Sequence, residues 1–159
     1  APVLLRATPM LVVSAFIFPL IGFERWALRP PVSISALLLF LVSVLAAMLL
    51  ACTFSMIMSI SLFWTISGDG VSNLVPVLVW SLCGIVIPIP FYPDWMQVVI
   101  RALPFRGLMD VPFQIYVGSI SPAFALLEIG LQGVWIAGLI VFSYGLLNRG
   151  LSRVVVQGG

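Results

Sequence analysis

The chain has 159 residues, of which 62% are hydrophobic and 8% are charged, and its mean hydropathy is +1.25. Soluble globular domains carry about 25% charged residues, so this composition excludes a soluble domain and indicates an integral membrane protein. Seven arginines against five acids give a net charge of +2, which is too small to suggest nucleic-acid binding. Lysine and histidine are absent.

Apolar runs of the length needed to span a bilayer recur along the chain. A hydrocarbon core of about 30 Å requires roughly 20 apolar residues in a helix. We therefore predict an all-α fold: one polytopic transmembrane helix bundle, with four spanning helices and two short re-entrant or interfacial helices before the last span. The expected elements of this single domain, residues 1–159, are spans at about 3–22, 33–64, 71–89 and 122–147, an interfacial segment at 90–120 and a cytoplasmic tail at 148–159.

The first apolar run opens the chain without an initiator methionine, and no signal-peptide cleavage pattern follows it. We therefore expect the chain to be a fragment that lacks an N-terminal part. Pro9 and Pro19 interrupt this run, which membrane helices tolerate because neighbouring helices satisfy the freed carbonyls.

The second expected span begins near Ser33, which caps the helix N-terminus after two prolines. No charge appears from Val32 to Ile66, so this helix is expected to be long, tilted and to project beyond the membrane. Its second half carries four hydroxyl side chains that either pack against a neighbouring helix or line a polar path, and packing is the favoured use. These residues are Ser55, Ser59, Thr65 and Ser67.

Turn signals separate the remaining spans. The Ser-Gly-Asp-Gly sequence at 67–70 predicts a short turn before the third span, in which Pro76 and Gly84 are the expected kink points. Ser121-Pro122 predicts the N-cap and first turn of the last span. The Asn-Arg-Gly sequence at 148–150 is expected to end it.

Residues 90–118 combine prolines, aromatic residues and two Arg/Asp pairs in a chain that is otherwise almost free of charge. Trp and Tyr favour the membrane–water interface, so we predict two short interfacial helices at the outer surface. Proline removes an amide hydrogen and ends the first helix near position 104. The residues assigned to this outer re-entrant segment are Pro90, Pro93, Trp95, Pro104 and Phe105, with Pro93 beginning the first helix.

Four charges in this segment admit two interpretations: a substrate-recognising cluster at the outer mouth, or side chains that face water on an amphipathic helix. The second is favoured, and an ion pair exposed there would contribute at most about 1 kcal/mol. The four residues are Asp94, Arg101, Arg106 and Asp110. On the first short helix, Asp94 and Arg101 lie opposite an apolar face that consists of Trp95, Val98, Val99 and Ala102.

Glu128, Gln132 and Trp135 share one face of the last span at i, i+4 and i+7 spacing. Glu128 and Gln132 are therefore candidates to line a translocation path. The alternative, which is favoured for Glu128, is an acid near the helix N-terminus that the helix dipole stabilises and that reaches water. Gly133 and Ala137 add a pair of small residues suited to close helix packing.

Residues for catalysis or cofactor binding are missing from the sequence. It contains no histidine, no HExxH or GxSxG motif, and no lysine for the GxxxxGK[ST] loop that cradles nucleotide phosphates. Cys52 and Cys83 lie inside apolar runs without a metal-ligand pattern and are expected to be small buried hydrophobes. We therefore predict a non-enzymatic chain without catalytic residues, cofactor or metal; if ATP drives it, another subunit binds the nucleotide.

The order of several elements resembles the permease subunits of type-2 ABC exporters. A long span is followed by Phe63-Trp64-Thr65 with a short glycine-containing loop, and then by another span. Next come Pro90-x-x-Pro93-x-Trp95, Leu103-Pro104-Phe105 and Pro112-x-Gln114-x-Tyr116-x-Gly118. A last span and an arginine-bearing tail that finishes in Gln157-Gly158-Gly159 complete the pattern, which matches the last four of the family's six spans.

This resemblance implies a multi-pass protein of the bacterial cytoplasmic membrane with both termini inside. It implies a homo- or heterodimer of permeases that forms the translocation path, driven by two separate nucleotide-binding ATPase subunits. The family's cytoplasmic loops dock on the ATPases, which would give residues 65–73 a contact role. The expected ATPase-contact residues are Thr65, Gly68, Asp69 and Gly70.

Charge alone supports this orientation weakly, and other functions stay open. Arg149 and Arg153 favour a cytoplasmic tail under the positive-inside rule, but four other arginines then lie outside. One alternative is a secondary transporter, which would need buried charges near the midplane that the expected spans lack. The other is an intramembrane enzyme or assembly factor with its site in the missing N-terminal part.

Overall fold

The computed structural model describes residues 17, 20, 30–61 and 69–154. The chain divides into two compact units, residues 1–31 and 32–159, and the helices named below all belong to the second. Every regular element in the described part of this unit is helical, which confirms the all-α prediction. The expected first span, at 3–22, lies outside the described residues apart from two isolated positions.

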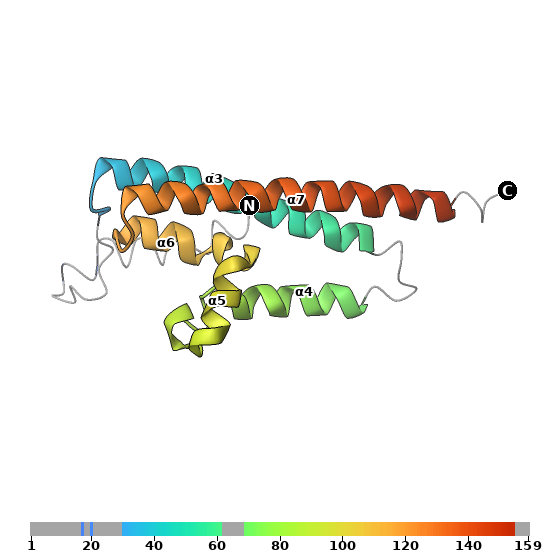
Figure 1. The fold of residues 1–159 in the computed structure, drawn as a ribbon, viewed down its shortest axis with the longest axis horizontal. Coiled ribbons are helices and arrows are strands. Elements are labelled where there is room, and N and C mark those ends of the chain that lie inside the picture. The colour runs from blue at the N-terminus through green and yellow to red at the C-terminus, as the bar shows by residue number, and fades with distance from the viewer. Residues whose placement is uncertain (1–16, 18–19, 21–29, 62–68, 155–159) are drawn as a thin grey trace. The chain divides into compact units, whose positions relative to one another are not determined.

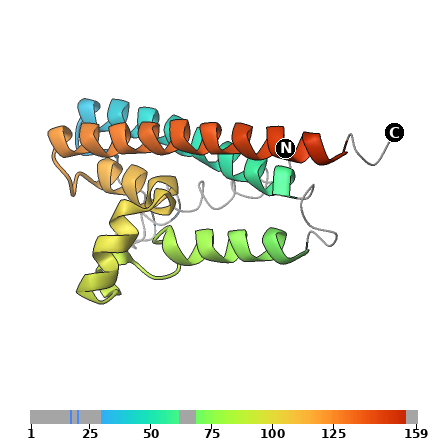
Figure 2. The same ribbon diagram turned by 45° about the vertical axis from the view of Figure 1, so that its right-hand side comes forward.

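Two long helices, α3 (Ile34–Ser61) and α7 (Pro122–Val154), lie side by side and run in the same direction (Figures 1 and 2). Both are long and apolar enough to cross a membrane, and they are the two candidate spans among the described residues. Most of their large apolar side chains are exposed, as lipid-facing side chains are. The four expected spans are therefore not all established.

The start of α3 follows the predicted cap. The Ser33 Oγ atom accepts a hydrogen bond from the Ala36 backbone N–H at 3.1 Å, which satisfies one of the free amides of the first turn. The helix contains 28 residues, or about 42 Å at 1.5 Å per residue, which exceeds a hydrocarbon core of about 30 Å.

The helix that runs back between the two long helices is shorter than expected. Helix α4 (Asp69–Leu82) runs in the opposite direction to them, as Figure 1 shows, but has only 14 residues, about 21 Å. The expected helix at 71–89 is therefore wrong beyond Leu82, because Gly84 adopts a positive φ of +87° and proline follows at position 88. Pro76 does lie inside the helix. Asp69 and Gly70 begin α4 rather than forming the expected turn.

A chain of short helices joins α4 to α7. It comprises η3 (Ile89–Phe91), α5 (Asp94–Ala102), η4 (Pro104–Leu108) and α6 (Asp110–Val117). The predicted break at Pro104 is confirmed, since Leu103 is extended with φ −81° and ψ 154°. Pro93 is the N-cap of α5 instead of its first residue, and its carbonyl accepts hydrogen bonds from the Met96 and Gln97 amides.

The last span begins as predicted and ends later. Helix α7 starts at Pro122, and the Ser121 carbonyl accepts a bond from the Ala125 amide. The helix then continues through 148–150 to Val154, so the expected stop is wrong. Asn and Arg are tolerated in a helix, and one glycine costs only about 1 kcal/mol when no proline follows it.

The core of this unit lies where α6 packs against the first halves of α3 and α7. Val111 and Ile115 of α6 and Ala125 of α7 are buried together. Partly buried apolar side chains surround them: Leu39, Phe40, Ile120 and Ile129. Gly118 ends α6 in the left-handed region, with φ +73°, and this turn brings the chain back into α7.

The charges on α7 suggest its depth in the bilayer. Between Glu128 and Arg149, residues 129–148 carry no charge, and 20 helical residues cover about 30 Å. We expect a spin label at Val98, on the exposed face of α5, to report the membrane interface, while a label at Val141 on α7 reports the hydrocarbon core. Power-saturation measurements with oxygen and a nickel chelate compare the two. Equal depth for both labels would contradict the interfacial placement of α5.

Candidate functional site

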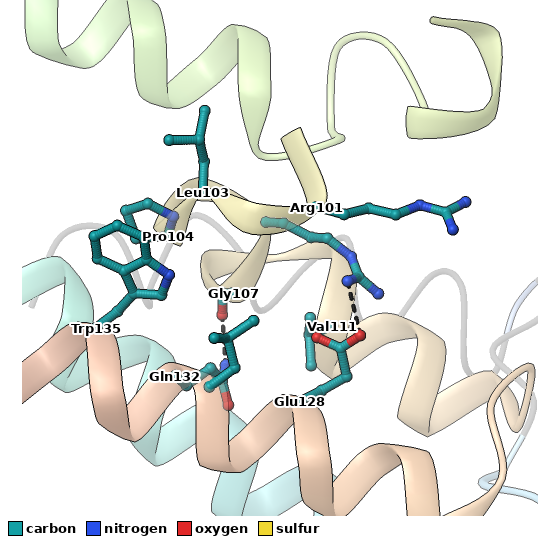
Figure 3. Close-up of a pocket in the computed structure, with 10 residues that line it drawn as sticks. Arg101, Leu103, Pro104, Gly107, Val111, Glu128, Gln132 and Trp135 are labelled. Atoms are coloured by element: carbon teal, nitrogen blue, oxygen red, sulfur yellow. Dashed lines mark hydrogen bonds and ion pairs between the residues drawn. The ribbon is translucent and has the colours of Figure 1, made fainter. Parts of the chain in front are cut away.

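A cluster of three charged side chains joins the short helices to α7. The Arg106 side chain, on η4, donates from Nε to Oδ2 of Asp110 at 2.8 Å and from Nη1 to Oε1 of Glu128 at 2.7 Å. Arg106 is only 8% exposed. Figure 3 shows the contact with Glu128. A buried charge is stable only when it is paired in this way.

The local fold places these groups within reach of one another. Asp110 lies in the first turn of α6, four residues after Arg106, and its Oδ2 atom also accepts a bond from Gln114 Nε2 at 2.8 Å. Glu128 lies two turns after the start of α7 and reaches Arg106 across 22 residues of sequence. The ion pair with Glu128 therefore depends on the turn that reverses the chain after α6.

One turn further along α7, Gln132 joins three segments. Its Nε2 donates to the Gly107 carbonyl at 2.6 Å, and its Oε1 accepts a bond from the Ser43 hydroxyl of α3 at 3.1 Å. The approach at Gly107 is close: a Cβ there would lie 3.1 Å from Gln132 Cγ and 3.3 Å from Leu50 Cδ2, so these side chains would have to shift by a few tenths of an ångström. Figure 3 shows the Gln132 side chain pointing at Gly107.

Trp135 continues the same face of α7. Its indole Nε1 donates to the Ala102 carbonyl at 3.1 Å, at the C-terminal end of α5. Together with Glu128 and Gln132 it holds residues 102–107, so the i, i+4, i+7 face forms one line of anchors for the outer segment. We name these three residues the α7 anchor face.

Two cavities flank this arrangement. One, of about 300 Å³, is lined by charged, polar and apolar residues from η3, α5, η4, α6 and the first turns of α7. The other, of about 530 Å³, lies between α3, α4 and the α6 region, and its lining is almost wholly apolar. Only the first has the mixture of apolar walls and convergent polar groups that is typical of ligand sites.

The family model described as "ABC-2 family transporter protein" matches residues 7–158. The chain belongs to this family. Neither the search of curated proteins nor that of solved structures gives a match. Membership of the ABC-2 family identifies the chain as a transporter component, in agreement with the resemblance seen in its sequence.

In this ABC-2 family protein the four charged side chains of residues 90–118 differ in their exposure to solvent. Asp94 and Arg101 are exposed, as expected. The water-facing prediction is wrong for Arg106 and Asp110, whose side chains are 10% and 15% exposed. The sequence analysis allowed an exposed ion pair among these charges, whereas their burial results from packing against α3 and α7, which no local pattern records.

Glu128 and Gln132 remain candidates for a translocation path, and the structure shows contacts that the sequence did not predict. Glu128 is ion-paired rather than merely surface-exposed, and Gln132 is buried. Of the other outer-segment residues, Pro104 is buried, and Pro90, Pro93 and Trp95 are exposed. Phe105 stacks on Phe54 of α3, with ring centroids 5.3 Å apart.

The remaining candidates lie apart from this cluster or outside the described residues. Thr65, Ser67 and Gly68 are outside the described residues. Ser55 and Ser59 donate back to carbonyls of their own helix, four residues earlier. Cys83 is buried as expected, whereas Cys52 is exposed on α3.

Among the described residues, no three His, Cys, Asp or Glu side chains lie close enough to hold a metal ion. The small pocket drawn in Figure 3 has a volume of about 10 Å³, which is about the minimum for one water molecule. The chemistry of the cluster in the described part is therefore that of ion pairing and hydrogen bonding.

We expect Arg106→Gln to destabilise the protein by about 3 kcal/mol, because it leaves two carboxylates close together without their shared cation. Glu128→Gln should cost less, since Oε1 of the amide still accepts a bond from Arg106. Arg101→Gln, at an exposed site, is the matched control and should change stability by less than about 0.5 kcal/mol. Equilibrium unfolding in mixed micelles measures the three variants, and equal losses for Arg106→Gln and Arg101→Gln would contradict the burial argument.

Proposed function

We propose that the chain is a permease subunit of an ATP-driven exporter in the bacterial cytoplasmic membrane, and that it forms the translocation path with a second permease protomer. The observation that carries this proposal is the family match over residues 7–158. The two long apolar helices supply spans for such a bundle. The sequence has no lysine for a phosphate-binding loop, so the nucleotide is bound by separate ATPase subunits.

The arrangement of helices supports a division into an outer and an inner end. Helix α6 lies beside the starts of α3 and α7, and the other short helices lie toward the same end, while α4 starts at the opposite end (Figure 1). Under the proposed orientation the short helices face outward and the C-terminal end of α7, which carries Arg149 and Arg153, lies in the cytoplasm. The start of α4, with the residues before it from Thr65, then contacts the ATPase.

The α7 anchor face gives the outer segment a mechanical role in this proposal. An exporter alternates between inward-open and outward-open states by rigid-body movement of packed helices. Because residues 102–107 are bonded to α7 at three successive positions, a tilt of α7 carries the outer segment with it. A secondary transporter would instead need charged groups near the midplane, and α3 carries none among its described residues.

We expect the purified chain, reconstituted alone, to hydrolyse no ATP, and the complex with its nucleotide-binding subunit to do so. Release of inorganic phosphate measures both. The control is the same complex with the P-loop lysine of the ATPase changed to alanine, which keeps the permease intact. Hydrolysis by the chain alone would contradict the proposal that a separate subunit binds and hydrolyses ATP.

The proposed orientation is tested by two single cysteines placed at opposite ends, in a background where Cys52→Ser and Cys83→Ala remove the native thiols. Cysteine at Ser119, which follows α6, should react with an impermeant maleimide on intact cells. Cysteine at Ser72, in the first turns of α4, should react only after permeabilisation and should crosslink to the ATPase subunit. The reverse labelling pattern would invert the topology.

A further inference from the structure

The larger cavity, of about 530 Å³, lies between α3, α4 and the segment from η4 to α6. Small buried side chains line its floor: Ala47 of α3 and Cys83, which follows α4. Large apolar side chains that are more than half exposed form its rim, and these are Met48, Trp80, Ile85 and Phe113. The cavity is therefore open to the surroundings of the helices. An apolar cavity of about 150 Å³ is already large enough to bind benzene.

The chemistry of the lining limits what can fill this cavity. None of the described side chains that line it carries a charge, an amide or a hydroxyl group. The Cys83 thiol donates to the Trp80 carbonyl at 3.5 Å, and the indole of Trp80 belongs to the exposed rim. A bound water molecule needs about two to four polar partners, and apolar cavities stay dry. The lining therefore favours a hydrocarbon occupant that is recognised by its shape.

The contact between α3 and α7 gives the depth of the cavity in the bilayer. The Ser43 hydroxyl donates to Gln132 at 3.1 Å, and the two helices run in the same direction, so positions 40 and 129 lie at about the same level. Phe40 and Ile129 accordingly pack on the same buried cluster. Residue 129 is the first of the uncharged stretch 129–148 of α7. The cavity, which Phe40 lines, therefore begins at the boundary of the hydrocarbon core.

The cavity ends near the middle of that core. Its lining residues on α3 extend from Phe40 to Ala51. The eleven steps between these positions cover about 16 Å at 1.5 Å per residue, or about half of a core of about 30 Å. This is the depth of one leaflet. A helix about 10 Å wide would need roughly 1,300 Å³ over the same length, more than twice the volume of the cavity.

We propose that this cavity binds one acyl chain of a membrane lipid, from the leaflet that borders the charged cluster around Glu128. The chain extends past Ala47 and Ala51 toward the bilayer centre, and its headgroup stays outside because no described lining residue is charged. Filling the cavity gives its walls the van der Waals partners that an empty space lacks. The acyl chain thereby packs α4 against α3. This binding does not depend on the proposed export function.

The test counts the lipids that bind to the whole chain after it has been purified in detergent and delipidated. Native mass spectrometry follows a titration with dipalmitoylphosphatidylcholine, and we expect saturation at one lipid per chain. Dipalmitoylphosphatidylglycerol should bind with the same affinity within about twofold, because the cavity does not contact the headgroup. Dihexanoylphosphatidylcholine, whose chains fill less than half of the cavity's length, should bind at least about tenfold more weakly.

Two results of this titration would overturn the proposal. One is the addition of lipid without saturation, as expected for lipid that only coats the apolar surface. The other is an affinity that changes with the headgroup and not with the length of the chain.

A pair of neighbouring variants locates the site. Ala51→Trp places a large ring in the cavity and should weaken lipid binding by at least about tenfold. Ala51 is exposed, so the ring does not disturb a buried core. Cys52→Trp, at the next position, also exposed but outside the cavity lining, is the control and should leave the affinity unchanged. Equal affinities for these two variants would overturn the assignment.

A second pair serves if Ala51→Trp fails to fold. Phe113→Ala removes part of the rim and should weaken lipid binding roughly three- to tenfold. Phe142→Ala truncates the same residue type at the same exposure, 57% against 56%, but outside the cavity lining. The Phe142→Ala variant should bind the lipid as the wild type does. Equal losses for the two variants would contradict the proposal.

The same spectra test a second copy of the chain as the other occupant. A lipid-free dimer that Ala51→Trp dissociates would show that a partner chain covers the cavity, and would overturn the proposal. A chain that retains one lipid, as a monomer or in a dimer that Ala51→Trp leaves intact, supports it. The measurement contains no ATP and no ATPase subunit, so its result is independent of the experiment that tests the exporter.

Discussion

The ion pair between Arg106 and Glu128 is the interaction on which the packing of the short helices against α7 depends. Arg106 is buried among apolar helices, and a guanidinium there is stable only while it is paired, here with Asp110 and Glu128. Moving the outer segment away from α7 would leave one buried positive charge with a single partner and expose Glu128 to its apolar neighbours. The cost of that separation keeps η4 and α6 on α7 as one body.

The other members of the α7 anchor face set the register of this contact. A lone ion pair allows rotation about its own axis, but Gln132 and Trp135 bind backbone carbonyls one and two turns further along. Gln132 also binds Ser43, so the same side chain fixes α7 against α3. The backbone at Gly107 also packs closely against Gln132 and Leu50.

The sequence predicted those features whose cause is local. Ser33 caps α3, the proline at 104 breaks the segment, and Ser121-Pro122 opens α7, because each effect acts within one helical turn. It did not predict the burial of Arg106, since its partner Glu128 lies 22 residues away and beyond a reversal at Gly118. The i, i+4, i+7 spacing of the α7 anchor face could be read from the sequence. The spacing does not, however, identify the residues that this helix face contacts. The early end of α4 was signalled by Gly84, whose positive φ ends the helix instead of kinking it.

Because α3 and α7 run in the same direction, the chain must return between them. The structure of the returning segment is limited by the hydrogen bonds that its backbone groups can make. Helix α4 covers about 21 Å, less than a full core, and residues 83–87 after it are irregular. Irregular backbone is stable at membrane depth only against protein or water, because lipid offers no hydrogen bonds. Tyr92 meets part of this need by donating from its hydroxyl to the Ser81 carbonyl at 2.8 Å, at the open end of α4. The irregular stretch at 83–88 is therefore stable only beside protein or water, and the same holds for the charged cluster around Glu128, at the N-terminal end of the uncharged part of α7. The bonds that α5 and η4 make with α7 hold the short helices at that end of α7.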